Sequence, residues 1–96
     1  MSENEFLDHA EAAMRTIEDR ILALDEDADA SRTGPVLNVE LSDGRNLVIN
    51  IQAAAGEIWV AARSGGFHYR PVEGGWRDTR GGEDLFAAVD RLVKAG

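Results

Sequence analysis

The spacing of apolar residues changes twice along this chain, and that change limits the folds available to it. Apolar residues recur at three- and four-residue steps over residues 4–25, alternate with other residues over 36–78, and return to the longer spacing over 83–95. A repeat near 3.6 residues predicts an amphipathic helix, whereas a repeat of two predicts a strand with one buried face. The order is therefore helix, several strands, helix.

The first helix, residues 4–25, has a clear beginning and a continuous apolar stripe. Ser2 and Glu5 have the spacing of a capping box, in which each side chain bonds a backbone amide of the other. The stripe consists of Phe6, Ala10, Ala13, Met14, Ile17, Ile21 and Leu24. The second helix, residues 83–95, has Leu85, Phe86, Val89, Leu92 and Val93 as its stripe and Gly96 as its expected stop.

Five strands are predicted between the helices, at about residues 36–41, 45–52, 57–63, 67–71 and 75–78. Residues 25–34 lack apolar periodicity and are predicted to form a loop, and Pro71 is expected to end its strand or to mark it as an edge. Every connection between strands is short, which implies antiparallel pairing. Both helices must bury their stripes, and the apolar face of the sheet is the large candidate surface. We therefore expect one α+β domain over residues 1–96, a two-layer sandwich with a five- to six-stranded antiparallel sheet and both helices on one face.

The negative charge is confined to the first third of the chain. Residues 1–29 contain ten acidic and two basic residues, whereas residues 30–96 contain eight of each, so the whole net charge of −8 belongs to the first segment. A basic footprint for phosphate backbones is absent, which argues against a nucleic-acid partner.

The composition excludes several other classes. The sequence has no cysteine, which excludes disulfides, thiolate metal sites and cysteine nucleophiles. No apolar run is long enough to span a bilayer, and the acidic first residues do not form a signal peptide, so we expect a cytoplasmic protein. His9 and His68 are predicted to lie in different layers, and no serine has a recognisable nucleophile setting. We therefore expect a protein that is not an enzyme.

The acidic segment offers only oxygen ligands, which suit hard or borderline cations. We expect it to bind Fe²⁺, Mn²⁺ or Ca²⁺ loosely, largely through water. The same charge could instead attract a basic protein surface, or serve only as a solvated face that aids solubility. The candidate metal ligands are Glu18, Asp19, Asp25, Glu26, Asp27 and Asp29.

Strand alternation predicts which side chains lie on the sheet face that the helices leave open. These are Asn38, Glu40, Val48, Asn50, Gln52, Trp59, Ala61, Arg63, His68 and Arg70. A large aromatic residue on a solvated face, near amides and a histidine, is typical of an anchor at a protein interface. The alternative is that Trp59 only packs against its cross-strand neighbours.

Four stretches of this sequence resemble the frataxin family, and most closely its bacterial branch, the CyaY proteins. They are Asn50 to Gln52, Glu57 to Ala61, Ser64 to Tyr69, and Trp76 with Asp78 to Arg80. Two departures stand out. Leu22 and Ala23 interrupt the acidic run where many bacterial members have further acids, and Ala54 replaces a proline of the family pattern.

The resemblance implies a small iron-binding regulator of iron–sulfur cluster assembly that binds the cysteine desulfurase and its scaffold protein. It implies weak Fe²⁺ and Fe³⁺ binding by the acidic candidates above. The net charge of −8 in 96 residues favours a monomer at low iron. A ferroxidase or iron-storing oligomer, or an acidic interaction module without a metal role, is the alternative. The predicted partner contacts are Glu11, Glu18, Asp19, Asn50, Gln52, Trp59, Arg63 and His68.

Overall fold

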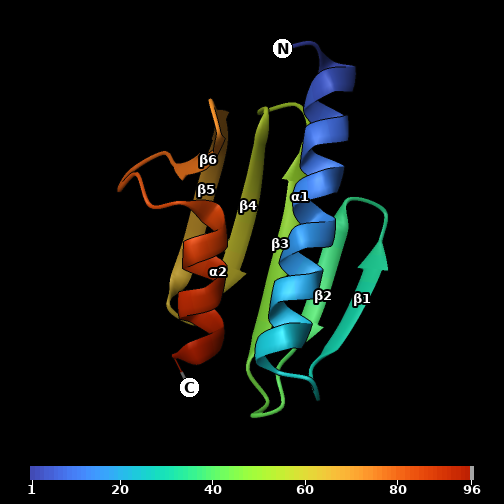
Figure 1. The fold of residues 1–96 in the computed structure, drawn as a ribbon, viewed down its shortest axis with the longest axis vertical. Coiled ribbons are helices and arrows are strands. Elements are labelled where there is room, and N and C mark those ends of the chain that lie inside the picture. The colour runs from blue at the N-terminus through green and yellow to red at the C-terminus, as the bar shows by residue number, and fades with distance from the viewer. Residues whose placement is uncertain (96) are drawn as a thin grey trace.

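Six antiparallel strands lie side by side in chain order, and both helices cross the same face of the sheet (Figure 1). The computed structural model describes residues 1–95, and Gly96, the predicted stop of the second helix, lies outside the described residues. The predicted α+β sandwich is confirmed, with six strands in the sheet. The elements are α1 (Glu3–Leu24), β1 (Asp29–Thr33), β2 (Val36–Glu40), β3 (Asn46–Gln52), β4 (Glu57–Ala62), β5 (Gly65–Val72), β6 (Gly75–Asp78) and α2 (Leu85–Lys94).

Both helices begin at a side-chain cap. The Ser2 hydroxyl accepts a hydrogen bond from the Glu5 amide at 3.2 Å, and the Glu5 carboxylate accepts one from the Ser2 amide at 3.0 Å. These bonds lower the pKa of Glu5. Asp84 caps α2 by accepting from the Ala87 amide at 3.1 Å, so α2 begins at Leu85, two residues later than predicted. Caps of this kind satisfy amides that the first turn of a helix leaves without partners.

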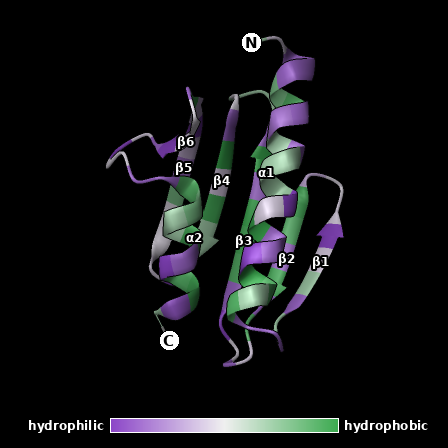
Figure 2. Cartoon of the chain, viewed as in Figure 1, coloured by the Kyte–Doolittle hydropathy of each residue, from purple (hydrophilic) through white to green (hydrophobic). Residues whose placement is uncertain are grey.

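The core lies between the helices and the inner face of the sheet, where the green apolar stretches of Figure 2 meet. Its largest fully buried side chain, Trp76, contacts two residues of α1: the Phe6 ring meets it edge-on at 5.8 Å, and the His9 ring stacks on it at 4.9 Å. Leu24, predicted to belong to the buried stripe, is 42% exposed. It is the last residue of α1, directly before the C-cap Asp25.

The prediction of a loop over residues 25–34 was wrong, because Asp29–Thr33 forms the strand β1. β1 pairs with β2 in a five-residue antiparallel register from Asp29 opposite Glu40 to Thr33 opposite Val36. It lies at the edge of the sheet, and four of its five side chains are exposed. A strand that buries almost nothing on either face needs no apolar alternation, so its sequence gave no signal.

The strand ends differ from the prediction in two further places. β4 ends at Ala62, which leaves Arg63 outside the strand. β5 continues past Pro71 to Val72, and it is not an edge strand, because it lies between β4 and β6. Its pairing with β4 stops at Tyr69, whereas its pairing with β6 includes Pro71 opposite Trp76. Pro71 therefore lies where β5 has a paired neighbour on one side alone, a position that tolerates a missing amide donor.

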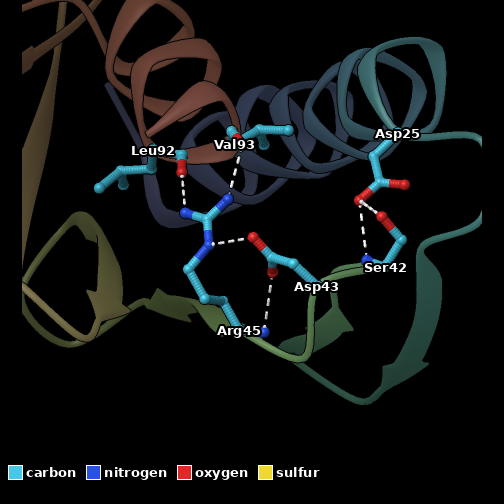
Figure 3. Close-up of polar contacts among 6 residues, drawn as sticks. All are labelled: Asp25, Ser42, Asp43, Arg45, Leu92 and Val93. Carbon is cyan, nitrogen blue, oxygen red and sulfur yellow. Dashed lines mark hydrogen bonds and ion pairs between the residues drawn. The ribbon is translucent and has the colours of Figure 1, made fainter. Parts of the chain in front are cut away.

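The connection between β2 and β3 holds the C-terminal ends of both helices (Figure 3). Asp25, the C-cap residue of α1, accepts hydrogen bonds from the amide and hydroxyl of Ser42 at 2.8 and 3.0 Å. Arg45 donates to the carbonyls of Leu92 and Val93 in the last turn of α2, at 2.6 and 2.8 Å. Asp43 accepts from Arg45 Nε at 2.8 Å and orients the guanidinium. One five-residue turn thus satisfies carbonyls and a carboxylate from two separate helices.

A second ion pair joins the helices directly. Arg20 of α1 donates through Nε and its terminal nitrogen to both carboxylate oxygens of Asp90 on α2. This two-point contact raises the pKa of Arg20 and lowers the pKa of Asp90. Across residues 1–95, no helix is long and apolar enough to cross a membrane.

The Arg45 contact predicts the effect of a substitution that keeps an unbranched apolar stem and removes the guanidinium. Arg45→Met removes the two donors to the carbonyls of α2 and leaves the last turn of that helix without these partners. We expect the free energy of unfolding to fall by about 2 kcal/mol and the Tm by roughly 10 °C. Thermal unfolding followed by circular dichroism measures this change. Arg15→Met, at an exposed position of α1, is the control. An equal loss of stability in both variants would contradict a stabilising role for the Arg45 hydrogen bonds to α2.

The Arg20–Asp90 pair predicts a pH dependence of stability. Because the pKa of Asp90 is lowered in the folded state, the pair's contribution is present at pH values above 3.8, the ordinary value for Asp, and is lost as the pH falls toward the lowered pKa. The Tm difference between the wild type and Asp90→Asn should therefore be largest near neutral pH and shrink below about pH 4. Melting curves across this range, with Asp8→Asn as a control at an exposed site, test it. A difference that stays constant with pH would contradict it.

Candidate functional site

The six predicted metal ligands follow the chain around the C-terminal end of α1. Glu18 and Asp19 lie on the last turns of the helix, Asp25 is its C-cap, Glu26 and Asp27 form the following turn, and Asp29 begins β1. Asp19, Glu26, Asp27 and Asp29 are exposed, whereas Glu18 and Asp25 are half-buried. We call these six residues the acidic end.

The acidic end is not a closed metal site. Among residues 1–95, no group of three or more His, Asp or Glu side chains is close enough together to hold an ion. Asp25 is already engaged, because both of its bonds from Ser42 go to Oδ2 (Figure 3). Exposed, separated carboxylates fit a hard cation that keeps most of its water, rather than an ion enclosed by protein ligands.

The helix itself makes this end electronegative. The C-terminal carbonyls of a helix carry a partial negative charge, which basic residues in the last turn usually offset. Within the described helix α1, the last turn contains no basic residue, and two acidic residues follow its cap directly. A cation at this end would therefore offset both the helix dipole and the repulsion among the carboxylates.

Glu11, predicted as a partner contact, is engaged within the protein. Both of its carboxylate oxygens accept from one terminal nitrogen of Arg32, at 2.9 and 2.7 Å, and the Arg32 Nε donates to the carbonyl of Gly34. This ion pair ties the middle of α1 to β1. Within residues 1–95, the other two acidic partner candidates, Glu18 and Asp19, form no ion pair.

The outer face of the sheet, opposite the helices, carries a cluster centred on Trp59. The Trp59 ring stacks on His68 at 4.4 Å with an interplanar angle of 10°, and the two residues are register partners on β4 and β5. The indole Nε1 donates to Glu57 Oε1 at 2.8 Å. Trp59 therefore does pack against its cross-strand neighbour His68. The indole is nevertheless only half-buried, so part of its surface is exposed to solvent.

Three of the predicted partner residues line one shallow pocket of about 190 Å³ on this face, namely Asn50, Trp59 and His68. Gln52 lies two residues further along β3, opposite Glu57. Arg63 is placed differently, because it lines a groove of about 470 Å³ beside the C-terminal end of α2, together with Arg45 and Leu92. Asn50, Trp59 and His68 thus lie together, whereas Arg63 lies apart from them, just beyond the end of β4.

Glu57 is the residue of this cluster that the sequence analysis missed. Its carboxylate holds the Trp59 indole, and it lies 3.6 Å from His68 Nδ1 and 3.7 Å from the Arg70 guanidinium. Its side chain is only 13% exposed. Strand alternation could have identified it, because Glu57 is two residues before Trp59 and so belongs to the same face.

Comparison with known proteins gives one consistent result. A model of the frataxin-like domain matches residues 1–95. The iron–sulfur cluster assembly protein CyaY of Paraburkholderia phytofirmans is 45% identical over 93 residues, covering 97% of this chain and 89% of that protein. The Burkholderia mallei protein of the same name is 42% identical over 92 residues.

Solved structures share the fold. A frataxin of the CyaY family from Psychromonas ingrahamii superimposes with a TM-score of 0.83 at 29% identity, covering 93% of this chain and 85% of that one. A trimeric frataxin from the yeast Saccharomyces cerevisiae, solved as a ferrous complex, superimposes with a TM-score of 0.70 at 24% identity, covering 99% and 85%. At this identity the yeast protein shows the fold alone.

Proposed function

The chain belongs to the frataxin family, and from that premise we propose that it is an iron-binding regulator of iron–sulfur cluster assembly. In this proposal it docks on the cysteine desulfurase and its scaffold protein and modulates sulfur transfer in response to iron. The observation that carries the proposal is the acidic end, where carboxylates gather at an uncompensated helix C-terminus. The relatives named for this pathway are bacterial, and we place this protein in the bacterial cytoplasm as a monomer at low iron.

The iron ligands in this proposal are Glu18, Asp19, Asp25, Glu26, Asp27 and Asp29. All offer carboxylate oxygens, which suit both Fe²⁺ and Fe³⁺, and none is enclosed, so binding should be weak and should retain water. The oxygen Asp25 Oδ1 is available to a cation, because the bonds from Ser42 go to Oδ2.

Docking would use two separate surfaces. The acidic end, with Glu18 and Asp19, suits a basic patch on the desulfurase, because opposite charges steer association and fix orientation. The outer face of the sheet, with Asn50, Gln52, Trp59 and His68, suits the scaffold, because it offers a half-exposed aromatic ring surrounded by amides. Arg63 lies beside the other groove, at the far end of β4. Iron bound at the acidic end would reduce its negative charge and so weaken or reorient the first contact.

A ferroxidase was the second possibility from the sequence. It would need two iron ions bridged by carboxylates, and residues 1–95 bring no three acidic or histidine side chains together. The geometry of the acidic end therefore favours regulation over oxidation, and we propose a protein that is not an enzyme.

Iron binding is tested by an anaerobic Fe²⁺ titration of ¹⁵N-labelled protein, followed by amide NMR. We expect paramagnetic broadening confined to residues 18–29. Glu26→Gln with Asp27→Asn should weaken the broadening about tenfold, because the variant has two fewer carboxylate ligands and a smaller negative potential at this end of α1. The matched control is Glu3→Gln with Asp8→Asn, which removes the same charge at the other end of α1. Broadening that is absent at millimolar iron, or equally weakened in the control, would count against the acidic end as the iron site.

Docking is tested with purified desulfurase and scaffold protein. Glu18→Lys with Asp19→Lys should reduce desulfurase affinity by roughly tenfold or more, with a larger effect at low salt. Trp59→Ala should spare desulfurase affinity and weaken the contact with the scaffold. Glu3→Lys with Asp8→Lys controls for net charge, and calorimetry measures each affinity. If the charge reversal at Glu18 and Asp19 left desulfurase affinity unchanged, this docking surface would be refuted.

A further inference from the structure

Two arginines lie directly opposite each other on the outer face of the sheet. Arg70 of β5 and Arg77 of β6 are register partners, and both are exposed. Their chain neighbours Tyr69 and Trp76 are buried against the helices, which places both arginines on the opposite face. Like charges directly opposite on neighbouring strands destabilise a sheet.

The protein neutralises this pair only in part. Arg70 lies 3.7 Å from Glu57, and its side chain is 67% exposed. Arg77 donates to the carbonyl of Gly82 at 2.9 Å, and within residues 1–95 no carboxylate lies within ion-pair distance of it. The Glu57 carboxylate is shared, because it also holds the Trp59 indole and lies 3.6 Å from His68. On the outer face, β5 and β6 thus present two guanidiniums against the one shared carboxylate of Glu57, on a chain of net charge −8.

We propose that Arg70 and Arg77 form a docking site for an acidic segment of a partner protein, with the stacked aromatic rings of Trp59 and His68 beside it. The proposal rests on the proposed function only in treating the outer sheet face as a docking face. It adds a charged region that the amide and aromatic candidates do not include, and it specifies the chemistry of the partner.

The chemistry of the two side chains fits carboxylates. A guanidinium binds a carboxylate through two parallel hydrogen bonds, and two guanidiniums on neighbouring strands can receive successive carboxylates of an extended chain. A bound acidic segment would also relieve the repulsion between the arginines, which gives it an affinity that a neutral segment lacks.

The overall charge argues for a short protein segment rather than a nucleic acid. A polyanion extends beyond the arginine pair and meets the potential of a chain whose net charge is −8. A segment with two or three carboxylates interacts mainly with the two guanidiniums, because charges beyond about 8 Å are largely screened at physiological salt.

The test uses a capped hexapeptide of alternating glutamate and alanine as the probe, titrated into ¹⁵N-labelled wild-type protein. We expect saturable shifts of the Arg70 and Arg77 amides and of the Trp59 indole N–H, weakened by added salt. Arg70→Gln with Arg77→Gln should abolish them. Arg15→Gln with Lys94→Gln is the matched control, because it changes the net charge equally at exposed positions away from this face, and it should preserve them.

Four results would overturn the proposal: no localised shifts, the same shifts with a glutamine–alanine hexapeptide, loss of the shifts in the control variant as well, or insensitivity to salt. Equal saturation by inorganic phosphate would assign the arginine pair to small anions instead. Shifts at these residues that grow with protein concentration alone would assign it to the acidic end of a second copy. Since neither iron nor desulfurase is present, the experiment can fail while the regulatory proposal stands, and the reverse also holds.

Discussion

Burial of the sheet on one face alone is the constraint from which the rest of this structure follows. α1 and α2 together cover the inner face, and the alternating apolar residues of β2 to β6 have no other place to become buried. Each strand therefore presents its remaining side chains to solvent on the outer face. The packing that stabilises the fold also fixes which side chains are available to partners. The Trp59 side chain lies on the outer face because its two neighbours along β4, Ile58 and Val60, are buried on the inner face.

The turn between β2 and β3 contacts the C-terminal ends of both helices, including Asp25 of the acidic end. A helix that ends on acidic residues is electrostatically unfavourable, because its C-terminal carbonyls are already negative. Ser42 provides two donors to Asp25 at this point, and Arg45 provides two donors to the last carbonyls of α2. The Asp43 carboxylate, whose pKa is lowered by its hydrogen bonds to Arg45, keeps the guanidinium in place. A single turn thus stabilises both helix ends, while the carboxylates of the acidic end beyond Asp25 form no ion pair within residues 1–95.

The sequence predicted the features that depend on burial and the local Ser2–Glu5 cap, and missed the polar contacts between residues far apart in the chain. Helix α1 and the outward position of Trp59 follow from periodicity, since one face of each element must be apolar. β1 was missed because an exposed edge strand has no such requirement. Sequence gave no sign that Glu11 would be paired with Arg32, 21 residues away, or that Asp25 would bond Ser42. Such contacts depend on which distant segments the fold brings side by side, and the local spacing of apolar residues does not specify this. Glu57 is intermediate, because strand alternation could have placed it on the Trp59 face, whereas its role as an acceptor depends on the folded structure.

The two candidate surfaces lie on different parts of the sandwich, and this separation has a functional consequence. The acidic end belongs to α1 and the edge strand β1, whereas the Trp59 cluster and the arginine pair lie on the outer face over β4 to β6. Partners on these surfaces would not compete for the same side chains, so one protein could contact two others at once. Coupling between distant sites needs an element with two discrete arrangements, and β3 and β4, which lie between the surfaces, are close-packed through their buried side chains. An effect of iron on cluster assembly would therefore act through the charge of the acidic end and the orientation in which the protein is held, rather than through a change of shape relayed across the sheet.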